Sequence, residues 1–110
     1  IRADITGKYF TDEQTEEAIK KVYDTTGYIL DPHTAVAYLG LKAYISENPA
    51  KDVTGIFLST AHPAKFIEVV NDVIGKNIEI PESLEAAGKL KKVSVPMSNQ
   101  FQDLKSYLLK

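Results

Sequence analysis

The chain of 110 residues has the length of one domain, and its 44% hydrophobic and 25% charged residues are ordinary for a globular protein. The net charge of −2 and the dispersed basic residues argue against nucleic acid as a partner, and no run approaches the roughly 20 apolar residues of a membrane helix. Because the sequence has no cysteine, disulfides and thiolate metal sites are excluded, which fits a cytoplasmic protein.

The first predicted helix follows Thr11. Thr11 is a capping hydroxyl and Gln14, three residues later, completes a capping box, while Gly27 is a natural helix stop. Four apolar residues recur at helical spacing between them: Ala18, Ile19, Val22 and Tyr23.

The second predicted helix opens at Asp31–Pro32 and ends at Asn48–Pro49. A carboxylate cap followed by proline is a strong helix start. Small residues recur along this helix and predict close packing against a neighbour: Ala35, Ala37, Gly40 and Ala43.

The second half of the sequence alternates between strand and helix patterns. Residues 53–60 and 91–97 are predicted as strands. Helices are predicted over 63–74, 82–90 and 98–109, the last with its apolar Phe101, Leu104 and Leu108 facing inward and Ser98 as its cap. These patterns predict an α/β fold with about two parallel-type strands covered by four to five helices. Two strands make a poor sheet, so we expect an incomplete one.

The turn between the first predicted strand and its helix is the candidate site. It places Ser59, Thr60, His62 and Lys65 within seven residues. Ligands of parallel sheets bind beyond the carboxyl ends of the strands, near helix N-termini, so these hydroxyls are candidates to bind a cofactor ring or an anion. The alternative is that Ser59, Thr60 or His62 only caps the helix and that Lys65 is a solvated side chain.

The two histidines, His33 and His62, both lie beside a proline at a predicted helix start. A zinc site normally takes three or four protein ligands, and no third ligand is indicated here. We therefore expect capping or packing, and no metal site. The sequence also has no P-loop, no nucleophile elbow and no GxGxxG motif.

Two strings resemble signature segments of the threonine synthase family: "TGYILDPHTAVAY" at 26–38 and "STAHPAKF" at 59–66. The flanking helices at 10–28 and 97–109 are also similar to that family, so the resemblance covers the whole chain. One departure is Ala37, where glycine is expected, and it adds only a methyl group.

The resemblance implies a pyridoxal-phosphate (PLP) enzyme of fold type II that converts O-phosphohomoserine and water to threonine and phosphate. By position it implies that Thr60 meets the pyridine nitrogen, with Ser59 as the alternative. It implies more weakly that His62 and Lys65 contact cofactor or substrate phosphate.

The family's Schiff-base lysine and its glycine-rich phosphate loop have no counterpart here, and the first residue is Ile1. We therefore expect residues 1–110 to be one C-terminal segment of a longer chain, without catalytic residues or activity of its own, whose main partner is the remainder of its polypeptide. The alternatives are a free-standing small α/β domain that binds an anion or a protein, and another lyase of the same cofactor fold.

Overall fold

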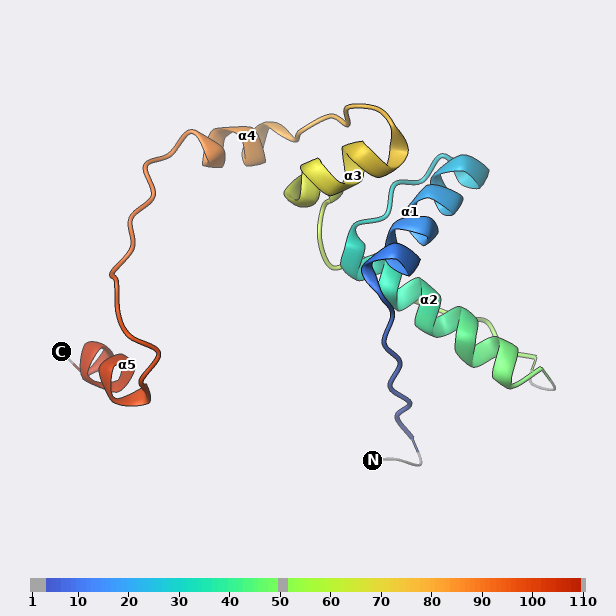
Figure 1. Cartoon of the computed structure of the whole chain (residues 1–110), viewed down its shortest axis with the longest axis horizontal. Helices are drawn as coiled ribbons and strands as arrows, with labels where there is room; N and C mark the ends of the chain where they lie inside the picture. The colour runs from blue at the N-terminus through green and yellow to red at the C-terminus, as the bar shows by residue number, and fades with distance from the viewer. Residues whose placement is uncertain (1–3, 50–51, 110) are drawn as a thin grey trace.

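The computed structural model describes residues 4–49 and 52–109, and it is helical (Figure 1). In chain order the helices are α1 (Asp12–Thr26), α2 (Pro32–Glu47), the 3₁₀ helix η1 (Pro63–Phe66), α3 (Ile67–Ile74), α4 (Glu82–Gly88) and α5 (Phe101–Leu108). All five predicted helices are therefore confirmed.

The predicted α/β fold is wrong, because no strand occurs in the described part of the chain. Residues 53–60 and 91–97 have no regular structure, although their sequences alternate as strands do. A strand needs a neighbour to bond its N–H and C=O groups, and neither segment lies against one. Ile56 is 82% and Val93 90% exposed, so the apolar faces that the pattern indicated are largely uncovered, and within 53–60 Phe57 packs against Tyr38 of α2 rather than in a sheet.

The start and end of α1 follow the predicted local rules. The Thr11 hydroxyl accepts a hydrogen bond from the Gln14 N–H, and the Gln14 side chain accepts one from the Thr11 N–H at 2.9 Å. At the other end Gly27 adopts φ 74°, where a side chain would be strained, and its N–H bonds the Tyr23 carbonyl. The helix is therefore fixed at both ends by its own sequence.

The first turn of α2 is held by Asp31, whose buried carboxylate accepts hydrogen bonds from the N–H groups of His33 and Thr34. Beyond this turn the helix is less buried than its small residues predicted. Only Thr34 and Ala35 are fully buried, and a methyl group added at Gly40 would meet nothing within 4 Å. Among the described residues, no neighbour uses the space that Gly40 leaves.

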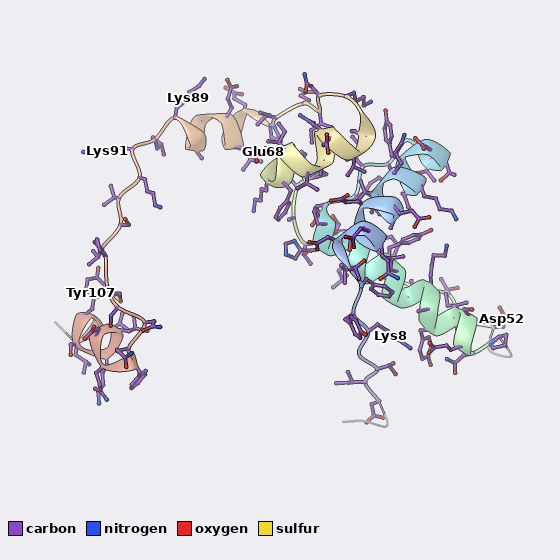
Figure 2. All side chains as sticks on the ribbon, in the orientation of Figure 1. Lys8, Asp52, Glu68, Lys89, Lys91 and Tyr107 are labelled. Carbon is purple, nitrogen blue, oxygen red and sulfur yellow. The ribbon has the colours of Figure 1, made fainter. Side chains whose placement is uncertain are left out.

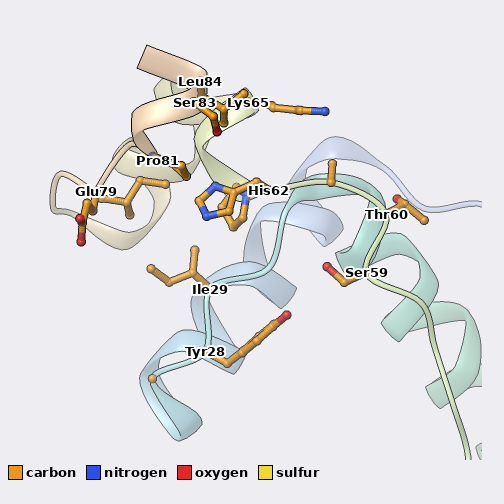
Figure 3. Close-up of a pocket in the computed structure, with 14 residues that line it drawn as sticks. Tyr28, Ile29, Ser59, Thr60, His62, Lys65, Glu79, Pro81, Ser83 and Leu84 are labelled. Atoms are coloured by element: carbon orange, nitrogen blue, oxygen red, sulfur yellow. The ribbon is translucent and has the colours of Figure 1, made fainter. Parts of the chain in front are cut away.

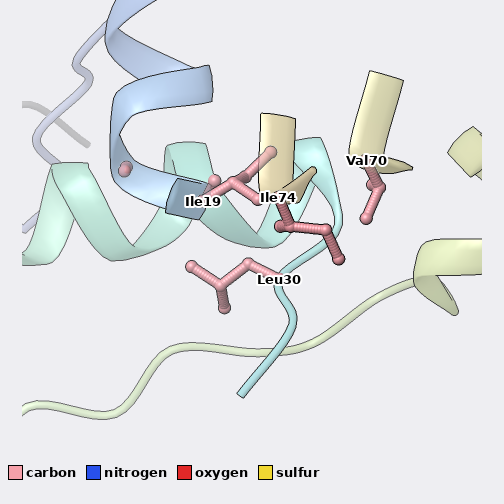
Figure 4. Packing of buried hydrophobic residues seen from close by; sticks show 6 residues of the cluster. Ile19, Leu30, Val70 and Ile74 are labelled. Atoms are coloured by element: carbon pink, nitrogen blue, oxygen red, sulfur yellow. The ribbon is translucent and has the colours of Figure 1, made fainter. Parts of the chain in front are cut away.

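The core lies where α1, α3 and the segment before α2 meet. Ile19, Leu30, Val70 and Ile74 fill its centre, and Figure 4 shows these side chains converging. Ile19, Leu30 and Val70 are at most 1% exposed. Burying an aliphatic side chain of this size contributes roughly 1.5–3 kcal/mol, so this small cluster holds α1 and α3 together.

The chain from α4 to its end forms an arm that leads away from this core (Figure 1). The radius of gyration is 18.9 Å, against about 13 Å for a compact domain of this length. The expectation that the apolar face of α5 points inward is wrong here, because Phe101 is 70% and Leu108 69% exposed. Figure 2 shows Lys91 and Tyr107 on this arm, away from α1–α3.

Ser98 stands close to its predicted capping role without filling it. The residue at the N-cap of α5 is Gln100, which makes no side-chain capping bond. The Ser98 hydroxyl instead accepts from the Gln100 N–H at 3.1 Å and donates to the Asp103 carboxylate at 2.5 Å. The start of α5 is therefore organised by Ser98 from two residues further upstream.

Candidate functional site

A cavity of about 890 Å³ lies where the 59–65 turn faces the α1–α2 connection and the loop before α4 (Figure 3). Its size is within the usual range for a small-molecule site, although it is open on one side. All four residues predicted for the site line it: Ser59, Thr60, His62 and Lys65.

The cavity wall at Ser59 and Thr60 carries two free hydroxyls. Both residues are exposed, and neither hydroxyl has a hydrogen-bond partner among the described residues. The alternative in which one of them caps the following helix is therefore not what the structure shows. Each hydroxyl is a donor and an acceptor, so either one is available to a heteroatom of a ligand.

His62 is the capping residue of this turn. Its Nδ1 accepts a hydrogen bond from the Ala64 N–H at 3.1 Å, which satisfies one of the open amides of η1. Since Nδ1 is the acceptor, Nε2 carries the proton of the neutral ring. His62 therefore caps the helix, as the simpler alternative predicts, and it keeps a donor for the cavity that it lines.

Lys65 lies within η1 and is exposed. Figure 3 shows its side chain extending from the turn near Ser83, with its nitrogen at the far end. No acidic partner for Lys65 occurs among the described ion pairs. The ammonium group therefore brings a positive charge to a cavity that the carboxylate of Glu79 also lines, without an ion pair to it.

Further cavity residues were not predicted from the sequence. Tyr28 and Ile29 come from the α1–α2 connection, and Figure 3 shows the Tyr28 hydroxyl directed toward the side of Ser59. Glu79 and Ser83 come from the opposite side, before and within α4. A signal for Tyr28 was available, since it directly follows the helix stop Gly27 inside the signature string at 26–38. Glu79 and Ser83 carry no such signal.

His33 does not line the cavity but lies beside it. Its Nδ1 is 3.4 Å from the buried Asp31 carboxylate, and its ring packs on Phe66 with 5.1 Å between centroids. Within the described ranges, no group of three or more His, Asp or Glu is placed to hold a metal ion. Nor is any described helix long and apolar enough to cross a membrane.

The cavity suits a planar, phosphorylated cofactor such as PLP on one side. Free hydroxyls can meet a ring nitrogen, and Lys65 and the Nε2–H of His62 can meet an anionic oxygen. The residues present therefore fit one edge of such a group.

The sequence and structure comparisons all match this chain to threonine synthases. The family model described as "Threonine synthase, C-terminal" matches residues 34–108. Threonine synthase of Haemophilus influenzae is 39% identical over 107 residues, which cover 97% of this chain and 24% of that protein. Threonine synthase of Saccharomyces cerevisiae is 39% identical over 101 residues, covering 81% of this chain and 20% of that protein.

Solved structures show the same relationship. The crystal structure of threonine synthase from Escherichia coli matches with a TM-score of 0.74 at 34% identity, covering 89% of this chain and 22% of that one. The structure from yeast matches with a TM-score of 0.68 at 39% identity, covering 81% and 20%. The chain thus spans less than a quarter of the length of these relatives. The region matched by the family model includes the 59–66 turn and most of α2, and the chain belongs to the threonine synthase family, in its C-terminal part.

Proposed function

We propose that this chain is the C-terminal segment of a threonine synthase and supplies the pyridine-nitrogen side of its PLP site. The complete enzyme would convert O-phosphohomoserine and water to L-threonine and phosphate in the cytoplasm. The family match and the 20–24% share of the relatives' length support a segment of a larger enzyme. The observation that carries the site is the pair of unpartnered hydroxyls, Ser59 and Thr60, on one cavity with His62 and Lys65.

Thr60 is our choice for the group that meets the pyridine nitrogen, and Ser59 is the alternative. When bound, PLP supplies an electron sink for the carbon–hydrogen and carbon–oxygen bonds that must break. A neutral hydroxyl at the ring nitrogen leaves that nitrogen less fully protonated than a carboxylate would, and so moderates the electron demand of the ring. The threonine methyl group also restricts the hydroxyl to fewer rotamers than serine has.

Lys65 and His62 line the same cavity, and we assign them the binding of a phosphate group. The ammonium group of Lys65 has no described ion-pair partner, and the Nε2–H of His62 is a second donor. Both fit the phosphate of the substrate or of the cofactor. The lysine that holds the cofactor belongs to the remainder of the polypeptide, so the chain alone should release no phosphate from O-phosphohomoserine.

The test is a pair of substitutions in the complete enzyme. Thr60→Val keeps the shape of the side chain and removes the hydroxyl, so turnover should fall by about tenfold to a hundredfold, as expected for one lost hydrogen bond to a buried polar group. The cofactor absorbance should shift as well. Ser59→Ala is the matched control and should change turnover less than about threefold by the same reasoning.

The two variants also separate the alternatives. If Ser59→Ala causes the loss and Thr60→Val does not, the ring-nitrogen role belongs to Ser59. If neither variant changes turnover or absorbance, the turn does not face the cofactor and the proposed site is wrong.

A further inference from the structure

Two aromatic pairs fasten the 57–66 segment to α2, one on each side of the Ser59–Thr60 turn. Upstream, the ring of Phe57 packs edge-on against Tyr38 with 5.7 Å between centroids and 62° between planes. Downstream, Phe66 packs against His33 with 5.1 Å between centroids and a tilt of 56°. The Ser59–Thr60 turn therefore lies between two ring contacts, and both of these contacts are made with α2.

On the α2 side, the backbone that carries His33 is fixed by the buried carboxylate of Asp31. Asp31, only 1% exposed, fixes the first turn of α2 through the N–H groups of His33 and Thr34. The His33 ring then lies with Nδ1 3.4 Å from the Asp31 carboxylate, which gives the ring a preferred direction. The carboxylate is itself fixed by its hydrogen bonds to the first turn of α2, so the ring lies between a fixed carboxylate and the ring of Phe66.

On the other side of these contacts, Phe66 is close in sequence to the residues proposed to bind the ligand. Phe66 closes η1, which contains Lys65 and begins directly after His62. Phe66 also packs against the hydrophobic core. A shift of Phe66 would therefore move η1, and with it the cavity residues at both of its ends.

We propose that His33 and Tyr38 are positioning residues, which clamp the Ser59–Thr60 turn on α2 through ring contacts with Phe66 and Phe57. The inference rests on the proposed function, because the position of the turn matters to catalysis only if the turn meets the cofactor. It assigns a task to His33 that neither capping nor metal binding explains. His33 has a side chain that is 66% exposed, so its ring contributes little to the stability of the fold.

The test uses the complete enzyme and measures the dissociation constant of PLP by titration, alongside thermal unfolding and steady-state kinetics. His33→Ala should weaken PLP binding about threefold to tenfold, the range expected for one aromatic pair, and should lower kcat with little change in KM. The unfolding temperature should stay at the wild-type value. His33→Phe restores a ring against Phe66 and should recover PLP affinity to within about twofold.

A double-substitution cycle tests the contact itself. His33→Ala combined with Phe66→Leu should weaken PLP binding no more than Phe66→Leu alone, because Phe66→Leu already removes the ring pair with His33. Tyr38→Ala should weaken PLP binding as His33→Ala does, from the other side of the turn, and should also lower the unfolding temperature because Tyr38 packs against the core. Ile45→Ala, which trims an exposed apolar side chain on the same helix, is the control and should leave PLP affinity unchanged.

The outcomes distinguish this inference from the proposed function. If Thr60→Val alters the cofactor absorbance while His33→Ala and Tyr38→Ala leave PLP affinity at the wild-type value, the clamp is refuted and the site stands. Additive losses in the cycle would also refute the clamp. If Thr60→Val has no effect either, the proposed function is what fails.

Discussion

The hydroxyl of Thr34 donates a hydrogen bond to the carboxylate of Asp31, and each of these residues is only 1% exposed. A buried carboxylate is stable only when its oxygens are satisfied, and here two backbone N–H groups and one hydroxyl satisfy them. This pair therefore determines where α2 begins, and α2 in turn carries the contacts to the 57–66 segment.

Removal of the Asp31 carboxylate should loosen the start of α2. Asp31→Ala loses the helix cap and leaves the Thr34 hydroxyl buried without its acceptor, so we expect local destabilisation of about 1–3 kcal/mol. Faster hydrogen exchange of the first α2 amides in the complete enzyme would report it. Thr25→Val is the matched control, because the Thr25 hydroxyl bonds the Lys21 carbonyl at an exposed position and its loss should cost much less. Equal effects of the two changes would contradict the assigned role of Asp31.

Two glycines should respond to alanine in opposite directions. Gly27 has φ 74°, so Gly27→Ala should destabilise the end of α1 by about 1 kcal/mol. Gly40 lies inside α2 with open space where an alanine methyl group would stand, so Gly40→Ala should stabilise that helix by about 0.5–1 kcal/mol. Denaturant unfolding of the complete enzyme measures both. A destabilising Gly40→Ala would show that a neighbour from the remainder of the polypeptide packs closely at Gly40.

The helices could be predicted from the sequence because the signals that define them are local. The capping box at Thr11 and Gln14, the cap at Asp31 and the stop at Gly27 each act within a few residues, and the structure confirms all of them. The strands at 53–60 and 91–97 depend on partners that the local sequence does not contain. Their alternating pattern indicates only that side chains would suit a covered surface.

The candidate site, like the fold, could be predicted only where its residues lie close together in the sequence. The string around Ser59 and Thr60 brought both hydroxyls, His62 and Lys65 together, and the structure places all four on one cavity. Glu79 and Ser83 reach that cavity only through the course of the loop after α3. Nothing in the spacing of the sequence encodes that course, so these two residues could not be predicted.

The first turn of α1 should give the protein a small pH dependence. The N–H of Glu13 and the Thr11 hydroxyl both bond the Glu13 carboxylate, which lowers the pKa of that group, although slight desolvation opposes the shift. The Glu13 carboxyl group therefore keeps its proton up to a higher pH in the unfolded chain than in the folded chain. The stabilisation from the charged carboxylate is complete above the unfolded pKa of about 4.3 and is lost as the pH falls through the lower folded pKa.

Glu13→Gln should therefore be less stable than wild type at neutral pH, and the difference should disappear as the pH falls through the lowered pKa of Glu13. A carboxyl titration of Glu13 by NMR would measure the lowered pKa directly. Glu16→Gln removes the same charge one turn further along α1 and is the control. If the two variants lose stability equally over the whole pH range, net charge rather than the helix start is responsible.

The double position of His62, as cap of η1 and as cavity residue, can be resolved by two substitutions. His62→Asn keeps a side-chain acceptor at a position where asparagine is among the best caps, whereas His62→Ala removes the cap at a cost of about 1 kcal/mol. If His62 only caps, the asparagine variant should retain wild-type turnover and the alanine variant should lose part of it. Our proposal gives Nε2–H a contact with phosphate, so both variants should raise the KM for O-phosphohomoserine or weaken PLP binding. Because only the alanine variant also destabilises η1, a loss common to both measures the contact of His62 with the ligand.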